Sequence, residues 1–193
     1  MKKLYFLILM FIVSVGQVYA QTVWKADPVH SNIQFEVTHL AISTVTGSFN
    51  DVNCTVKSKS KDFNGASILA TVNVDDISTE NMTRDKHLKQ DDFFNAQMYP
   101  KIKFVSSSFS KLSDSEYELK GDLTIRDVTK SVTIPVDYSG QITLGKKVVS
   151  AFKANFKINR FDYGLKWNDT IDTGSLVVGE DVDVTLNLEL VKQ

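Results

Sequence analysis

The stretch Val182-Asp183-Val184-Thr185-Leu186-Asn187-Leu188-Glu189-Leu190 alternates apolar and polar residues without a break. Successive side chains of a β-strand point to opposite faces of the sheet, so this pattern predicts a strand with one dry face. Roughly eight such stretches follow one another along the chain, the first carrying Ile33, Phe35 and Val37. Many exceed the ~5 to 6 residues usual for strands. The sequence therefore predicts an all-β protein.

Two places interrupt the alternation. The second stretch shifts register near Asn50 or Asp51, which a β-bulge explains. Period two then fails from Ile77 to Met98, where Ser78, Thr79, Asp91 and Asp92 are candidate helix caps. We expect one or two short helices there, ended by Pro100.

An eight-stranded antiparallel barrel with a short helical insertion is the natural solution for such a series. Its interior is just wide enough to be filled by side chains or to hold one small ligand, and the alternation leaves both open. No aromatic girdle recurs at the strand ends, so the pattern does not favour a membrane-embedded barrel. No linker or repeat divides the series, which predicts one domain over residues 21–193.

The first twenty residues have the pattern of a secretory signal peptide. Lys2 and Lys3 precede an apolar run from Leu4 to Val15, and Val18-Tyr19-Ala20 is a small-residue cleavage site. The run is shorter than the roughly 20 apolar residues of a transmembrane anchor, so we expect no transmembrane segment. The mature protein is expected to be periplasmic or secreted.

Composition excludes several partners. Without residues 1–20 the chain has 20 basic and 23 acidic residues, a formal charge of −3. Nucleic acids and anionic membrane surfaces both require a clustered excess of Lys and Arg, so neither is an expected partner. Cys54 occupies the apolar register of its strand and is expected to be a buried hydrophobe.

Catalytic motifs are few. The sequence carries none of the zinc-helix, Walker or nucleophile-elbow patterns. His30 and His39 flank one strand, roughly 30 Å apart if the strand is straight, so we expect no shared metal. His87, near Arg84 and Asp85, is compatible with a general base or with a surface ion pair.

Several segments together resemble the YceI-like family of exported, lipocalin-like proteins. The resemblance rests on residues 24–31 (WKADPVHS), 83–88 (TRDKHL), 92–94 (DFF), 99–104 (YPKIKF), 121–125 (GDLTI), 129–132 (TKSV) and 159–164 (NRFDYG). It covers essentially the whole of residues 21–193. Asp127 departs from the glycine common in the family, and residues 165–174 match no fixed motif.

The resemblance implies a lipocalin-like barrel whose apolar tunnel binds a long isoprenoid or similar lipid, such as a quinone. It implies a binding protein that needs no cofactor and is not an enzyme. The alternating register places the expected tunnel residues on the inner face: Ile33, Phe35, Phe49, Phe104, Leu123, Val136, Phe152, Phe156 and Val184. Phe93 and Phe94, in the helical insertion, are expected either to close one end of the tunnel or to anchor the helix.

Arg84 and Arg160 are the candidates for binding a polar or anionic head group, because a guanidinium presents several donors in a fixed fork. Each is equally compatible with a structural salt bridge, with Asp85 or Asp162 as the partner. Two other functions stay open: an enzyme acting on the same lipid through Arg84, Asp85 and His87, and a structural barrel with a filled core. The sequence also leaves a homodimer and the identity of the lipid open.

Overall fold

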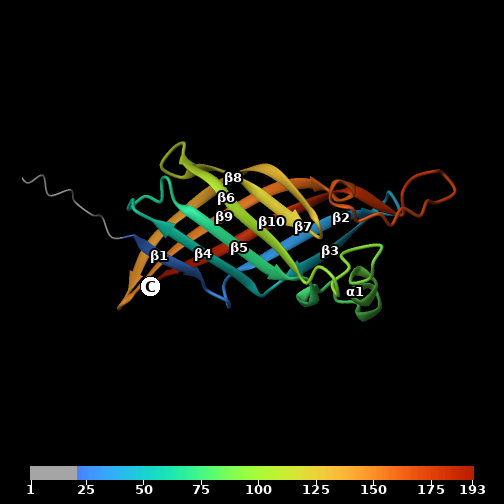
Figure 1. Cartoon of the computed structure of the whole chain (residues 1–193), viewed down its shortest axis with the longest axis horizontal. Helices are drawn as coiled ribbons and strands as arrows, with labels where there is room; N and C mark the ends of the chain where they lie inside the picture. Colours follow the sequence, from blue (N-terminus) through green and yellow to red (C-terminus); the bar gives the residue numbers. More distant parts are fainter. Residues whose placement is uncertain (1–20) are drawn as a thin grey trace, which may run out of the picture.

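The computed structural model describes residues 21–193, so the predicted signal peptide lies outside the described residues. Strands dominate this range and form one antiparallel sheet that closes on itself (Figure 1). The strands are β1 (Thr22–Ala26), β2 (Asn32–His39), β3 (Ser43–Phe49), β4 (Val52–Ser58), β5 (Ser67–Asn73), β6 (Lys101–Lys111), β7 (Glu116–Ile125), β8 (Val128–Leu144), β9 (Lys147–Asn159) and β10 (Val178–Lys192). Three helices interrupt them: η1 (Val74–Asp76), α1 (Met82–Leu88) and η2 (Arg160–Tyr163). No helix in residues 21–193 is long and apolar enough to cross a membrane.

The ten strand segments make a closed ring of eight. β10 pairs with β9 along one edge and with both β1 and β2 along the other. β1 and β2 follow one path that is interrupted at residues 27–31, and β3 and β4 are separated only by residues 50–51. Counted as paths, the strands number eight, which confirms the predicted barrel. The break at residues 50–51 falls where the sequence predicts a bulge.

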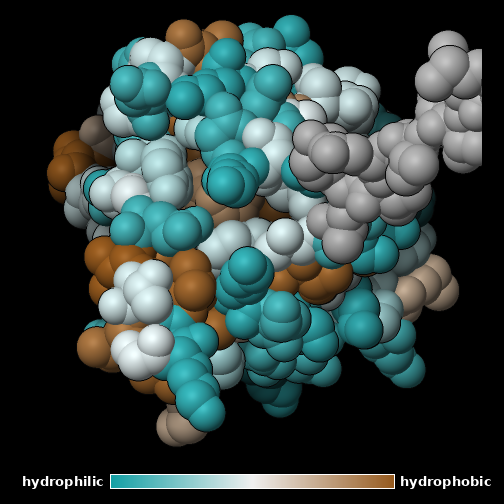
Figure 2. Space-filling view, turned by 90° about the vertical axis from the view of Figure 1, so that its left-hand side faces the viewer, coloured by the Kyte–Doolittle hydropathy of each residue, from teal (hydrophilic) through white to brown (hydrophobic). Residues whose placement is uncertain are grey.

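One end of the barrel is filled by aromatic side chains, here called the basal cluster: Trp24, Phe63, Phe109, Tyr117 and Phe152. The ring centroids of Trp24 and Phe63 lie 5.0 Å apart, those of Phe63 and Phe152 lie 5.1 Å apart, and Phe109 stacks on Tyr117 at 4.7 Å. Figure 2 looks onto this end, where hydrophilic residues cover much of the surface and hydrophobic ones gather toward one side.

Phe63 reaches the basal cluster from the loop between β4 and β5. Its φ is +62°, uncommon for a residue with a side chain, and only 1% of the residue is exposed. The loop is held to the β6–β7 hairpin by a bond from the Gly65 amide to the Phe109 carbonyl (2.8 Å) and one from the Lys111 amide to the Asn64 side chain (3.0 Å). The loop is therefore held across this end of the barrel and closes it.

The opposite end is covered by α1 and the turns that follow it. Asn81 caps α1 by accepting a hydrogen bond from the Arg84 amide at 3.0 Å, so the predicted caps Ser78 and Thr79 are wrong. The second helix allowed by the sequence is also absent from the described residues, because the segment after α1 forms turns. The Asp92 carboxylate is bonded to the His87 ring at 2.8 Å instead of capping a helix.

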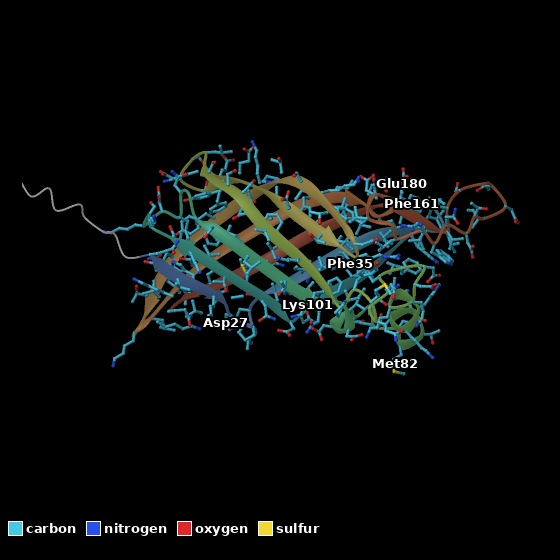
Figure 3. All side chains as sticks on the ribbon, viewed as in Figure 1. Asp27, Phe35, Met82, Lys101, Phe161 and Glu180 are labelled. Carbon is cyan, nitrogen blue, oxygen red and sulfur yellow. The ribbon has the colours of Figure 1, made fainter. Side chains whose placement is uncertain are left out.

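Asp27 holds residues 27–31, the interruption between β1 and β2, in place (Figure 3). Its carboxylate accepts hydrogen bonds from the Val29 amide (3.0 Å) and the His30 ring (3.1 Å), and it pairs with the Lys147 ammonium at 2.9 Å. The hydrogen bond from Lys147, followed by the amide of Val29, lowers the pKa of Asp27 to about 2. Asp27 thus joins the β1–β2 path to β9.

We expect Gly121→Ala to destabilise the barrel by about 1–3 kcal/mol, the usual cost of overpacking. A Cβ on Gly121 would meet the Val105 carbonyl oxygen and the Phe104 ring, whereas a Cβ on Gly179 would lie 3.3 Å from its nearest atom, in Thr38. Urea unfolding of G121A and of the control G179A measures the difference. Equal stabilities of the two variants would contradict this packing argument.

We expect Asp27→Asn to lower the free energy of unfolding at neutral pH and to weaken the dependence of this free energy on pH under acidic conditions. The Asp27 carboxyl has a pKa of about 2 in the folded protein and an ordinary value near 3.8 in the unfolded chain, so its contribution is complete above about pH 4. It is lost as the pH falls through about 2. Urea unfolding between pH 6 and pH 2 measures this, with Asp172→Asn, in an exposed loop position, as the control. Parallel pH profiles for wild type and D27N would rule out the linkage.

Candidate functional site

The barrel interior contains two adjoining cavities, with volumes of about 130 Å³ and about 160 Å³. The first, the deep compartment, borders Phe63, Phe109 and Phe152, and the second, the outer compartment, borders Leu88 and Phe93. Six residues line both and are called the shared ring: Ile33, Val72, Ile102, Leu123, Phe156 and Val184. The two compartments therefore lie end to end along the barrel, and together they are called the tunnel.

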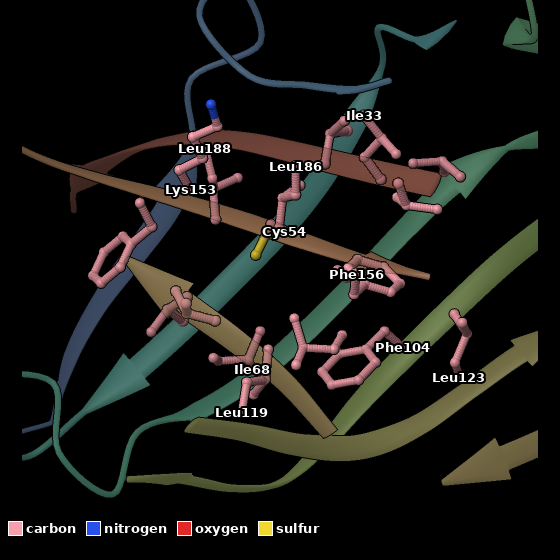
Figure 4. A pocket seen from close by; sticks show the side chains of 18 of the residues that line it. Ile33, Cys54, Ile68, Phe104, Leu119, Leu123, Lys153, Phe156, Leu186 and Leu188 are labelled. Atoms are coloured by element: carbon pink, nitrogen blue, oxygen red, sulfur yellow. The ribbon is translucent and has the colours of Figure 1, made fainter. Parts of the chain in front are cut away.

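The unfilled volume of the tunnel favours a pocket over a filled core. Protein interiors are close-packed, with few voids larger than a water molecule, so cavities of this size are unusual in a core. A buried water needs ~10–15 Å³ and 2–4 polar groups to hydrogen-bond with. The tunnel has enough space for water, but its walls offer almost no polar groups. Lys153 lines the deep compartment, but its amine points away from it (Figure 4). The space suits hydrocarbon better than water.

Cys54 illustrates the character of the deep compartment. Its sulfur projects toward the space between the labelled side chains in Figure 4, and the residue is buried. Burial away from water raises the pKa of the Cys54 thiol to about 12. The thiol is therefore un-ionised at neutral pH and acts as a small apolar wall residue, which confirms the sequence expectation.

Twelve of the thirteen predicted site residues line the tunnel. Phe104, Val136 and Phe152 face the deep compartment; Ile33, Leu123, Phe156 and Val184 belong to the shared ring; Phe35, Phe49, Phe93, Phe94 and Arg160 face the outer compartment. Arg84 lines neither. The inward register is as predicted, while a role of these residues in ligand binding stays a prediction.

Arg84 is engaged with the segment that precedes α1. Its Nε donates to the Thr79 hydroxyl and its Nη2 to the Thr79 carbonyl, both at 2.7 Å. The Asp85 carboxylate accepts the Thr79 amide at 2.8 Å, and His87 is paired with Asp92. The arrangement that an enzyme would need, with His87 oriented by Asp85 beside Arg84, is therefore not assembled.

Arg160 lies at the outer compartment and is 3% exposed. Its Nε, Nη1 and Nη2 donate to the carbonyls of Gly179 (2.8 Å), Leu165 (2.8 Å) and Val178 (2.9 Å). Burial lowers the pKa of this guanidinium, and the charge of Glu180 partly opposes that effect. The predicted partner Asp162 is paired with Lys130 instead, at 3.0 Å. Arg160 thus binds the residues after η2 to the start of β10.

The turns that carry Phe93 and Phe94 are tied to the loop after η2. Arg126 donates through Nη1 to the carbonyls of Asp91 (3.0 Å), Phe93 (2.8 Å) and Gly164 (2.7 Å). Phe93 stacks on Trp167 with centroids 5.7 Å apart. Arg126 lies in the tight β7–β8 turn with a φ of +56°, and its side chain crosses from this turn to the residues beside Phe93.

Sequence reasoning named Phe93, Phe94 and Arg160 but missed four other tunnel residues that lie outside strands. Leu88, Tyr163 and Leu165 border the outer compartment, and Phe63 borders the deep one. These residues are in turns and helices, where period two gives no register. The available signal for Phe63 was its position as a lone aromatic residue within the polar stretch 57–67.

The family model of the YceI-like domain matches residues 24–190. This chain belongs to the YceI-like family. A UPF0312 protein of Staphylococcus aureus (strain MSSA476) is 34% identical over 165 residues, which cover 84% of this chain and 94% of that protein. The crystal structure of a Campylobacter jejuni YceI protein matches with 29% identity and a TM-score of 0.67, over 79% of this chain and 87% of that one.

A more distant structure shows the same fold. It is described as a polyisoprenoid-binding domain from Saccharophagus degradans implicated in plant cell wall breakdown. Its TM-score is 0.65, at 14% identity, over 86% of this chain and 97% of that one. At this identity the likeness establishes the shared YceI-like barrel.

We expect Arg160→Lys to destabilise this YceI-like protein by about 2–4 kcal/mol, because the single nitrogen of a lysine ammonium cannot reach three carbonyls that are spread around a guanidinium, which leaves buried acceptors unpaired. The control Asp162→Asn removes only the surface pair with Lys130 and should cost less than about 1 kcal/mol. Urea unfolding of both variants measures the two effects. A cost for R160K no larger than that for D162N would show that the carbonyl cluster is dispensable.

Proposed function

We propose that this protein binds one long-chain isoprenoid or similar lipid inside the barrel, without reacting with it, for transport, storage or sequestration. The observation that carries the proposal is the tunnel of two adjoining apolar compartments. The structural neighbour described as a polyisoprenoid-binding domain lends support, because it has the same barrel fold. A quinone with an isoprenoid tail is included in the proposed ligand class.

The energetics of such a site require few polar contacts. Each buried CH₂ group contributes roughly 0.8 kcal/mol, so a chain that buries twenty carbons gains on the order of 16 kcal/mol in gross terms. Association costs an estimated 4–15 kcal/mol, which leaves a net gain across most of that range. A hydrocarbon wall is therefore sufficient, and it accounts for the absence of a binding motif in the sequence.

The geometry around α1 supports binding rather than catalysis. Arg84 and Asp85 are both committed to Thr79, and the three Arg160 donors are committed to carbonyls. None of these groups is arranged to activate a substrate atom in the tunnel. We further propose that the signal peptide is removed near Ala20 and that the mature protein acts in the periplasm or outside the cell.

We expect Ile102→Trp to abolish lipid binding while the barrel stays folded. Ile102 belongs to the shared ring, so an indole there would obstruct the passage between the compartments. The matched control is Val105→Trp on the same strand, where the side chain points outward and is 42% exposed. Native mass spectrometry of protein purified from its own cell envelope, followed by solvent extraction, measures the bound lipid.

The proposal predicts a stoichiometric long-chain adduct in wild type and V105W and a bare mass for I102W. The same native mass shows whether the chain starts at Gln21 and whether it is a monomer or a homodimer. A bare wild-type mass that stays unchanged after incubation with polyprenols and quinones would overturn the lipid-binding function. Circular dichroism of I102W confirms that loss of binding is not loss of fold.

A further inference from the structure

The two ends of the tunnel are closed by different kinds of structure. Around the outer compartment, Leu88, Phe93 and Leu165 come from a short helix and from turns. The deep compartment ends on Phe63, Phe109 and Phe152, and the other two rings of the basal cluster pack against them, Trp24 on Phe63 and Tyr117 on Phe109. The members of the basal cluster are all buried. The deep end is therefore a blind end.

Phe63 is held in this position by several bonds across the base of the barrel. Besides the bonds of Gly65 and Asn64 to the β6–β7 hairpin, the Tyr117 hydroxyl donates to the Asp62 carbonyl next to Phe63. The Lys111 ammonium lies 3.7 Å from the Asp62 carboxylate. These bonds hold the backbone on both sides of Phe63, and its buried ring packs against Trp24 and Phe152, so the tunnel has a fixed stop at this end.

β10 gives the length of the tunnel, because it lines both compartments from Val178 to Leu190. Twelve residue steps at ~3.3 Å, on a strand tilted by about 40°, correspond to roughly 30 Å along the barrel axis at most. Three backbone bonds of a peptide span at most ~3.6 Å, so the four chain bonds of an isoprene unit span about 4.8 Å. The tunnel therefore accommodates about six extended units.

We propose that the basal cluster, with Phe63 at its centre, is a ruler that sets the longest linear isoprenoid chain the tunnel can bury. The proposal rests on the lipid-binding function proposed above. The end of the chain meets Phe63, and any unit beyond about the sixth stays outside and gains nothing from burial. Affinity then rises with chain length up to that limit and no further.

The test uses native mass spectrometry of the mature protein, residues 21–193, incubated with an equimolar mixture of all-trans polyprenols of three to nine units. We expect the amount of each polyprenol bound to wild type to rise with chain length up to a limit near six units and to stay level from there to nine units. Phe63→Leu shortens the stop and should raise the limit by about one unit. Ile68→Phe, which narrows the deep compartment, should lower it by about one unit.

Two matched controls separate a ruler from a general change in packing. Phe161→Leu removes the same atoms as F63L but at a residue that lines neither compartment, and Leu69→Phe adds the same ring as I68F on the outer face of β5, where the side chain is 47% exposed. Both should keep the wild-type limit. Should F63L fail to fold, the comparison of I68F with L69F decides the question.

The outcomes distinguish this proposal from the one on which it rests. Polyprenols bound with the same length limit in wild type, F63L and I68F would overturn the ruler and leave lipid binding intact. A shift in F161L as large as that in F63L would also overturn it. Wild type that binds no polyprenol of any length would overturn both the lipid-binding function and the ruler.

Discussion

Closure of the sheet between β10 and the β1–β2 path is the constraint on which the rest of the structure depends. Once the ring is closed, every strand has an inner and an outer face, and a slip of one residue would turn its polar side chains into the interior. β10 pairs with β9 from Asp181 to Val191 and with β2 from Val178 to Asn187. These long ladders fix the register that directs the apolar residues of Val182–Leu190 inward.

The same ladders explain why the interior can stay open. The circumference of a barrel is set by the number of its strands and their stagger, not by how well the inner side chains fill the space. Collapse of the walls onto the cavity would break interstrand hydrogen bonds, whereas a helical core can close around a void by small shifts. The cost of the unfilled space, about 24 cal/mol per Å³ in measured cases, is therefore carried by the hydrogen-bonded wall. A bound hydrocarbon chain would recover that cost.

The period-two alternation predicted the features of this molecule that depend on strand geometry. The eight strand paths and the inward register of the tunnel follow from alternation alone, because burial on one face leaves a direct trace in the sequence. The parts it missed have no such trace. β1 is short and buries only Trp24 among Thr22–Ala26, Asp92 pairs with His87 instead of capping a helix, and Phe63 enters the tunnel from a turn. Each of these features depends on contacts between residues that are distant in sequence or that lie outside a regular element.

Polar groups are placed at the outer end of the tunnel and are largely satisfied there. Arg160 meets three carbonyls, and Arg126 binds the turns beside Phe93. Along the wall between the ends, Ile102, Leu123 and Val184 offer only dispersion and the exclusion of water. A wall of this kind separates hydrocarbons weakly, since one methylene changes affinity by only about 1–3 kcal/mol. Under the proposed function, such a wall would not distinguish chemical groups along a chain, and selection would depend on geometry: the width at the shared ring and the distance from the outer compartment to Phe63.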